Sequence, residues 1–408
     1  MNNRTSSAEQ LQILPQIFKW SLLSILVGLL AGTASAIFLV SLDWATAFRN
    51  NHTWIIFLLP LGGFAIGWIY HTLGKSVEAG NNLLLEEIHD PKNVIPLRMA
   101  LLVLVGTLAT HFLGGSAGRE GTAVQMGGSL ADQLTRPLNL SRDDRRILLM
   151  AGISAGFASV FGTPLAGAIF GLEVLAIGHL RYDSILPCFL SAIIAHGITL
   201  AWGITHTVYA VPFVPPLSWF NLLQIAIAGA LFGLAGAGFT WSIHKVTALF
   251  KKYIAYAPFR PLVGGVFIIL LAGAFQTHRY LGLGIPTMLD AFQGHLPFHD
   301  FLAKTLFTSI TLGSGFKGGE VTPLFFIGAT LGNALSYLMT LPTAVLAGVG
   351  LVAVFAGAAN TPICCIFLAM EMFGSPMGVY AGVGCVMSYL FSGHSGIYRS
   401  QQTHARKI

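Results

Sequence analysis

Residues 114–128 read GGSAGREGTAVQMGG, a stretch that places the acid Glu120 among glycines at the start of an apolar run. The pattern predicts a helix that begins near Glu120. The first N–H groups of a helix have no partner within the helix and lie at the positive end of its dipole. Such a helix start binds anions, and Glu120 is itself an anion that can compete there with one from solution.

The chain around this stretch is strongly apolar. Of its 408 residues, 54% are hydrophobic and 9% are charged. This composition exceeds the apolar content of soluble domains and predicts an all-α polytopic membrane protein. Some apolar runs, such as Leu262–Phe275 and Thr361–Met372, are too short to cross a bilayer alone. We therefore expect broken, tilted helices whose loose ends line a cavity within the protein.

The net charge of +6 comes from basic residues at the chain ends and in short stretches such as 136–146, 245–260 and 399–407. Cytoplasmic loops of membrane proteins carry such an excess of Lys and Arg. The pattern therefore favours loops on the cytoplasmic side, with both termini inside the cell, over a nucleic-acid partner.

The sequence gives little support for a metal site or an enzyme active site. The four cysteines lie in apolar segments and are interpreted as small core residues, and the 13 histidines show no paired metal-ligand spacing. No phosphate-binding Walker loop is present. We expect no metal, no cofactor and no enzymatic activity.

The chain repeats itself at an interval of about 200 residues. Residues 152–164, GISAGFASVFGTP, are echoed by residues 350–362, GLVAVFAGAANTP, and GREGT at 118–122 is echoed by GGEVT at 318–322. Glu120 thus aligns with Glu320. Transporters built from inverted repeats aim broken helices at one site near the membrane midplane.

The repeat divides the chain into two transmembrane halves, residues 17–210 and 217–400, with cytoplasmic tails at 1–16 and 401–408. Eight helices are expected in the first half, and the second half repeats them from Leu217. They are Ile17–Phe48, Trp54–Leu73, a short helix at Gly80, one before Gly114, the helix at Glu120, and helices through Ile147, Ala166 and Ile193. A final short segment runs from Gly396.

Two further stretches carry hydrogen-bond donors. Residues 80–85 read GNNLLL, and the amides of Asn81 and Asn82 can donate to an anion, although a helix cap or a loop is the alternative interpretation. Residues 395–400 read SGIYRS, where Tyr398 offers a phenol, the alternative being an aromatic residue at the membrane interface.

Acidic residues in apolar surroundings are costly and usually functional. This favours a functional role for Glu120, with a structural salt bridge to Arg119 as the alternative, and likewise for Glu320. Glu173 and Glu371 end matching helices of the two repeats, ten residues after a Thr-Pro pair. For these two we expect a structural role, bonding backbone N–H groups.

GREGT, the GGEVTP that ends at Pro323 and the late Tyr398, in this order and spacing, resemble the CLC family of chloride channels and anion/proton antiporters. The resemblance covers about residues 18–399. It implies an all-helical inverted repeat in the lipid bilayer and a homodimer with one pore per subunit. It also implies a gating glutamate, matched by Glu120, and a transmembrane-only member without a regulatory domain.

The departures from the family pattern point to one branch. Asn81 stands where the family has the serine of GSGIP, GGEVTP replaces GxFxP, and the inner proton-relaying glutamate falls on Val174. These changes resemble the bacterial fluoride/proton antiporters, which implies location in the inner membrane. Fluoride is small and tightly hydrated, so removing its water requires several strong donors.

We therefore expect a transporter that exports fluoride in exchange for protons. The alternative is a chloride- or nitrate-selective channel or anion/proton exchanger of the same family. A cation carrier is disfavoured because helix N-termini repel cations. The residues expected to bind the anion are Asn81, Asn82, Gly118, Gly121, Thr122, Val321, Thr322 and Tyr398, and those expected to gate it and couple it to protons are Glu120 and Glu320.

Overall fold

The structure is a computed structural model that describes the backbone of residues 5–407 and the side chains of residues 13–407. Over this range it contains sixteen α-helices, four short 3-10 helices and two strands of two residues each. Residues 1–4 and 408, which belong to the two expected tails, lie outside the described residues. The described part of the expected first tail is helical, because the first helix begins at Thr5 and continues through Pro15.

The first half holds eight α-helices. They are α1 (Thr5–Asn51), α2 (Leu59–Leu73), α3 (Asn81–His89), α4 (Arg98–Leu113), α5 (Glu120–Asp132), α6 (Arg142–Phe161), α7 (Pro164–Glu173) and α8 (Ile185–Ala201). The 3-10 helices here are η1 (Thr53–Leu58), η2 (Lys75–Val77) and η3 (Tyr182–Ser184). Each helix expected from the sequence is present, although η1 precedes α2 where one continuous helix was expected from Trp54.

The second half repeats this order. Its helices are α9 (Trp219–Tyr253), α10 (Phe259–Phe275), α11 (Ile285–Gln293), α12 (Asp300–Ser314), α13 (Val321–Leu335), α14 (Thr343–Ala359), α15 (Pro362–Phe373), η4 (Ser375–Met377) and α16 (Gly378–Phe391). The last segment contains β2 (Gln402–Thr403), which pairs in parallel with β1 (Ala176–Ile177) of the first half.

The repeated Thr-Pro pairs mark equivalent helix starts. Gly162 and Asn360 end α6 and α14 in the left-handed conformation, with φ of 77° and 57°. Pro164 and Pro362 then occupy the first turn of α7 and α15, where a missing N–H costs no hydrogen bond. A short break followed by a new helix is thus specified locally, and in the same way, in both halves.

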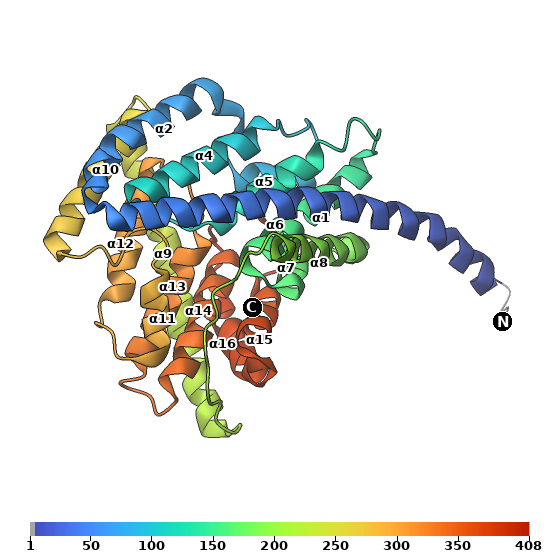
Figure 1. Cartoon of the computed structure of the whole chain (residues 1–408). Coiled ribbons are helices and arrows are strands. Elements are labelled where there is room, and N and C mark those ends of the chain that lie inside the picture. The colour runs from blue at the N-terminus through green and yellow to red at the C-terminus, as the bar shows by residue number, and fades with distance from the viewer. Residues whose placement is uncertain (1–4, 408) are drawn as a thin grey trace.

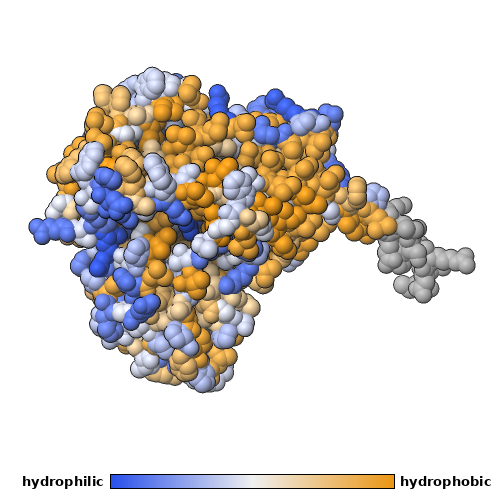
Figure 2. All heavy atoms as spheres, in the orientation of Figure 1, coloured by the Kyte–Doolittle hydropathy of each residue, from blue (hydrophilic) through white to orange (hydrophobic). Residues whose placement is uncertain are grey.

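The outer helices are long and the inner ones are short. By length and composition, four helical stretches within the described residues can cross a membrane: Ile13–Asn51, Thr53–Leu73, Tyr182–Ala201 and Trp219–Tyr253. Figure 1 shows α1 crossing the front of the molecule, where it packs against α4, α5, α6 and α8. Figure 2 shows a broad hydrophobic area on the same face, as expected of a surface in contact with lipid.

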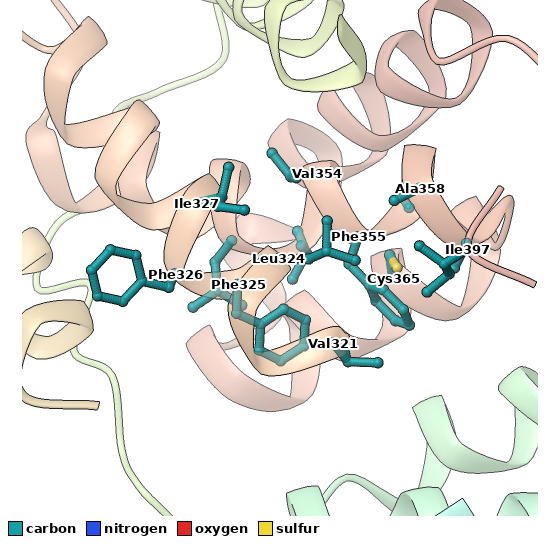
Figure 3. Packing of buried hydrophobic residues seen from close by; sticks show 14 of the residues in the cluster. Val321, Leu324, Phe325, Phe326, Ile327, Val354, Phe355, Ala358, Cys365 and Ile397 are labelled. Carbon is teal, nitrogen blue, oxygen red and sulfur yellow. The ribbon is translucent and has the colours of Figure 1, made fainter. Parts of the chain in front are cut away.

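The inner helices lie inside the protein. Every residue of α13 is buried, as is nearly every residue of α5 and α14. Figure 3 shows side chains of α13, including Leu324 and Phe325, packed with Phe355 of α14. Because protein surrounds these short helices, their loose ends face neighbouring polar groups and not lipid.

Facing glycines bring the inner helices close together. A Cβ on Gly328 of α13 would collide with the carbonyl oxygen of Gly350 of α14, and Gly127 of α5 faces Gly152 of α6 in the same way. Small residues at such crossings allow the close backbone packing on which helix association in membranes depends. The pairing recurs in both halves, as the repeat requires.

Reciprocal hydrogen bonds tie the halves together. The carboxylate of Glu173, at the end of α7, accepts the N–H groups of Ile363 (3.0 Å) and Cys364 (2.7 Å) at the start of α15. Glu371, at the end of α15, accepts those of Leu165 (2.9 Å) and Ala166 (2.8 Å) at the start of α7. Each carboxylate caps a helix of the opposite half and satisfies N–H groups that have no partner within their own helix.

We predict that Gly328→Val strongly lowers stability, because the added side chain must push α13 and α14 apart. Overpacking of this kind costs about 1–3 kcal/mol or more. Thermal unfolding of the purified protein in detergent measures the effect. Gly238→Val is the matched control, since nothing lies within 4 Å of a Cβ at that position of α9. Equal melting temperatures for the two variants would contradict the packing argument.

Candidate functional site

The two glutamate-bearing segments meet at the centre of the fold. Gly118 and Gly319 form an antiparallel bridge in which Gly118 N–H donates to Gly319 O (2.7 Å) and Gly319 N–H donates to Gly118 O (2.8 Å). The bridge joins nearly equivalent positions of the two repeats. It therefore sets the first turns of α5 and α13 side by side, as the repeat led us to expect.

Glu120 is the first residue of α5, yet its carboxylate lies at the start of α13. Thr322 donates to Glu120 Oε2 from its backbone N–H (3.0 Å) and from its hydroxyl (2.6 Å). The N–H of Arg119 also donates to this oxygen (3.2 Å). The side chain is 1% exposed. The sequence had suggested that Glu120 occupies its own helix start; the Gly118–Gly319 bridge instead presents the α13 start to it.

The Arg119–Glu120 salt bridge, the alternative considered for Glu120, is loose. Arg119 Nε lies 3.7 Å from Glu120 Oε1, and within the described residues this nitrogen is buried without a hydrogen-bond partner. The closer and more numerous contacts of the carboxylate are with Thr322. The geometry is that of an anion held by a helix N-terminus.

A polar cavity of about 180 Å³, here called the polar vestibule, lies beside this contact. Asn81, Asn82, Glu320 and Tyr398 line it, so four of the residues singled out from the sequence come together. The other residues of its wall are Tyr70, Val77, Glu78, Ala79, Gly80, Val103, Gln125, Leu312, Phe316, Lys317, Gly318 and Ile397.

The two asparagines differ in their contacts. Asn81 Oδ1 is buried and has no hydrogen-bond partner among the described residues, while its Nδ2 would lie 3.0 Å from a Cβ on Gly121. The Asn81 amide is thus next to the first turn of α5. Asn82 Oδ1 accepts the N–H of Ser400 (3.0 Å), which ties α3 to the C-terminal segment. α3 begins after Gly80, whose φ of 60° suits glycine, and no side chain caps the start of this helix.

Glu320 and Tyr398 line the vestibule. Glu320 immediately precedes α13, and its carboxylate forms no salt bridge within residues 13–407. Tyr398 is 6% exposed, and its ring lies edge-on to Phe170 at 6.2 Å between centroids. A buried phenol in this position donates a hydrogen bond when an acceptor enters the vestibule.

Two residues expected to bind the anion, Gly118 and Thr122, direct their polar groups to other parts of the protein. The N–H of Gly118 donates to Gly319, so it is not free for an anion in this conformation. The Thr122 hydroxyl lies 2.7 Å from the Thr107 hydroxyl of α4, and Thr122 lines neither cavity at the site. In this structure the inter-repeat bridge and the α4–α5 contact use these polar groups, and the expected role of both residues stays a prediction.

Three expected ligands belong to the helix starts themselves. The N–H groups of Gly121 and Val321 lie in the first turns of α5 and α13, which have no acceptor of their own within the helix. Thr322 uses both its donors on Glu120. In this conformation the carboxylate therefore occupies the donors that an anion would need.

A second cavity of about 20 Å³, the small pocket, holds roughly one water molecule. Glu120 and Thr322 line the small pocket but not the polar vestibule. The other lining residues are Arg119, Phe161, Thr207, Tyr209, Ile285, Met288, Phe325 and Met372. The Glu120–Thr322 contact therefore borders the small pocket, whereas Glu320 borders the vestibule.

Four polar vestibule residues were missed from the sequence: Tyr70, Glu78, Gln125 and Lys317. Lys317 directly precedes GGEVT, and Gln125 is a polar residue in the apolar run after Glu120. The sequence therefore offered a signal for both Lys317 and Gln125. Tyr70 gives no such signal, because nothing local indicates that the end of α2 returns to the site.

Comparisons with known proteins agree with this architecture. The family model described as voltage gated chloride channel matches residues 62–393. The chain is 55% identical over 400 residues, covering 97% of it and 88% of the relative, to a protein of Pseudomonas syringae pv. tomato named chloride/fluoride channel protein. It is 27% identical over 422 residues, covering 94% and 88%, to the H(+)/Cl(-) exchange transporter ClcA of Vibrio vulnificus.

Solved structures share the fold. A crystal structure of a CLC-type fluoride/proton antiporter matches with a TM-score of 0.92 at 34% identity, covering 95% of this chain and 98% of that one. A slow cyanobacterial Cl-/H+ antiporter matches with a TM-score of 0.81 at 22% identity, over 93% and 96%, which supports the fold alone. The chain has the expected CLC-type inverted repeat of broken, tilted helices and belongs to the voltage-gated chloride channel (CLC) family.

Proposed function

We propose that this protein is a secondary active transporter that exports fluoride in exchange for protons. The observation that carries the proposal is the Glu120 carboxylate bound to the N–H and hydroxyl of Thr322 at the start of α13. An anion and a carboxylate compete for the same donors there. Two relatives whose names or titles mention fluoride, one at 55% and one at 34% identity, support the choice of anion.

The competition couples the two flows. When Glu120 is ionised it occupies the α13 start and interrupts the path between the cavities. When Glu120 is protonated its charge is lost, its hold on the Thr322 N–H weakens, and an anion can replace it. A carboxylate that alternates between these states carries a proton one way as the anion moves the other way.

The donors around the path suit fluoride. Asn81 and Tyr398 offer an amide and a phenol in the vestibule, and the first turns of α5 and α13 offer backbone N–H groups. A small, hard anion loses more hydration energy than chloride on entering a protein, so it needs short, strong bonds from several donors. In this conformation none of those vestibule donors is committed to another acceptor within residues 13–407.

Glu320 is the best candidate for the inner part of the proton route. Its carboxylate lines the vestibule, and Oε2 would lie 3.8 Å from a Cβ on Gly121, the residue after Glu120. Val174, at the position of the proton-relaying glutamate of chloride antiporters, is buried and cannot carry a proton. In this proposal Glu320 relays the proton, so no carboxylate is needed at position 174.

The setting of the transporter follows from the same proposal. We place it as a homodimer in the inner membrane of a bacterial cell, with its termini in the cytoplasm and fluoride export driven by the inward proton gradient. Basic residues near the chain end, such as Arg399 and Lys407, support this orientation.

A chloride-selective exchanger is the second candidate, supported by the chloride/proton exchangers among the relatives. Fluoride and chloride fluxes through one preparation of the protein in liposomes separate the two. A larger flux of chloride than of fluoride would favour this candidate.

Glu120→Gln is predicted to abolish proton movement, because the amide cannot lose or carry a proton. The protein in liposomes should first move fluoride out as protons move in, measured with a fluoride electrode and a pH electrode. The variant should then pass fluoride without protons, or none. Protons still moving with fluoride in the variant would refute the role of Glu120.

Asn81→Ser should shift the preference from fluoride toward chloride. Losing one amide donor to a charged ligand costs about 1.5 kcal/mol, which corresponds to roughly a tenfold change in the flux ratio. Both fluxes are measured in the same liposomes. Asn51→Ser, at the exposed end of α1, is the control and should leave the ratio unchanged. An unaltered ratio in Asn81→Ser would exclude this residue from selectivity.

A further inference from the structure

Lys317 is a cation in the polar vestibule that no role yet accounts for. It lies in the loop before α13, three residues before Glu320, and lines the vestibule. Its ammonium lies 3.9 Å from the centroid of the Tyr70 ring. Within residues 13–407 it forms no salt bridge and no hydrogen bond, and it shares the cavity with the carboxylate of Glu78.

The position of this side chain is built into the fold. A Cβ on Gly106 of α4 would lie 2.9 Å from Lys317 Cγ and 3.0 Å from Lys317 Cβ, so only glycine leaves room for the stem. The same Cβ would lie 3.5 Å from Tyr70 Cε2. The stem therefore runs between α4 and the Tyr70 ring, and a cation over an aromatic face is held by the charge distribution of the ring.

The cation has no counterpart in the other half. In the alignment of GREGT with GGEVT, Lys317 corresponds to Ala117, which is fully buried. Conversely, Arg119 corresponds to Gly319. The Arg119 cation lies 3.7 Å from the Glu120 carboxylate, whereas the Lys317 ammonium forms no salt bridge within residues 13–407. Of the two cations, only Arg119 therefore lies next to Glu120, and the Lys317 ammonium is available to an ion that enters the vestibule.

The vestibule needs such a charge to admit an anion. Its charged side chains are Glu78, Glu320 and Lys317. Without Lys317 the ionised acids would repel a halide through a partly desolvated space, where charges act more strongly than in water. A single ammonium, with three N–H donors, offsets this repulsion and can donate to an anion.

We propose that Lys317 sets the affinity of the vestibule for its anion, turning its ammonium from the Tyr70 ring to a small halide that enters. This inference rests on the proposed transport of fluoride and adds the residue that captures the ion. Because a ring holds a cation more weakly than an anion does, the ammonium is kept in place when the vestibule is empty and is released when the ion arrives.

The test compares half-saturating fluoride concentrations for efflux from liposomes. Lys317→Met should raise this concentration on the order of tenfold, the effect of losing one partly screened charge. The ratio of protons to fluoride should not change, since Glu120 and Glu320 are intact. Lys317→Arg keeps the charge and stacks on Tyr70, so it should stay close to the wild type.

Lys252→Met is the matched control. Its ammonium also lies over a tyrosine ring, 5.4 Å from the centroid of Tyr253, but at the exposed end of α9 and outside the vestibule. It should leave the half-saturating concentration unchanged. A wild-type value for Lys317→Met, or an altered proton ratio, would overturn the proposal.

Titration of solubilised protein with sodium fluoride and sodium chloride separates this inference from the transport proposal. Weaker anion binding by Lys317→Met than by wild type and Lys252→Met supports capture by Lys317, even if that variant moves no ions. Equal binding refutes it. If wild-type liposomes move no protons against fluoride, the transport proposal fails, while the binding comparison still decides the role of Lys317.

Discussion

The structure depends on one contact, in which a carboxylate from one half of the chain occupies a helix start in the other. Glu120 accepts two hydrogen bonds from Thr322, 202 positions later in the sequence. The contact exists because the Gly118–Gly319 bridge brings the first turns of α5 and α13 together. A helix start attracts any small anion. The hydrogen bonds that hold a carboxylate there are stronger while it is charged.

Short helices inside a membrane protein create a problem that this fold solves three times. Each break exposes N–H groups that lipid cannot satisfy. At α7 and α15 the breaks are closed by Glu371 and Glu173 of the opposite half. At the start of α13, Thr322 donates to Glu120 of the first half in the same way. Carboxylates of one half thus cap helix starts of the other at all three places.

The sequence by itself determined the class of protein, the eight helices of each half and the family. These depend on local or periodic features: apolar length, Thr-Pro pairs that restart a helix, and a repeat that survives in GREGT and GGEVT. It also singled out Asn81, Glu320 and Tyr398 as candidate site residues, and these three line one cavity of the fold. The first helix extends twelve residues earlier than expected, since Pro15 did not end it.

Only the tertiary structure decided which partners these residues meet. Asn82 bonds Ser400, 318 positions away, and Tyr70 reaches the vestibule from α2. The hydroxyl of Thr122 contacts that of Thr107, whereas the hydroxyl of Thr322, at the equivalent position of the repeat, donates to Glu120. Glu120 occupies the α13 start and not its own. A hydrogen bond requires a partner within about 3 Å, and the packing of glycine-faced helices from both halves sets those distances, which no single stretch of sequence encodes.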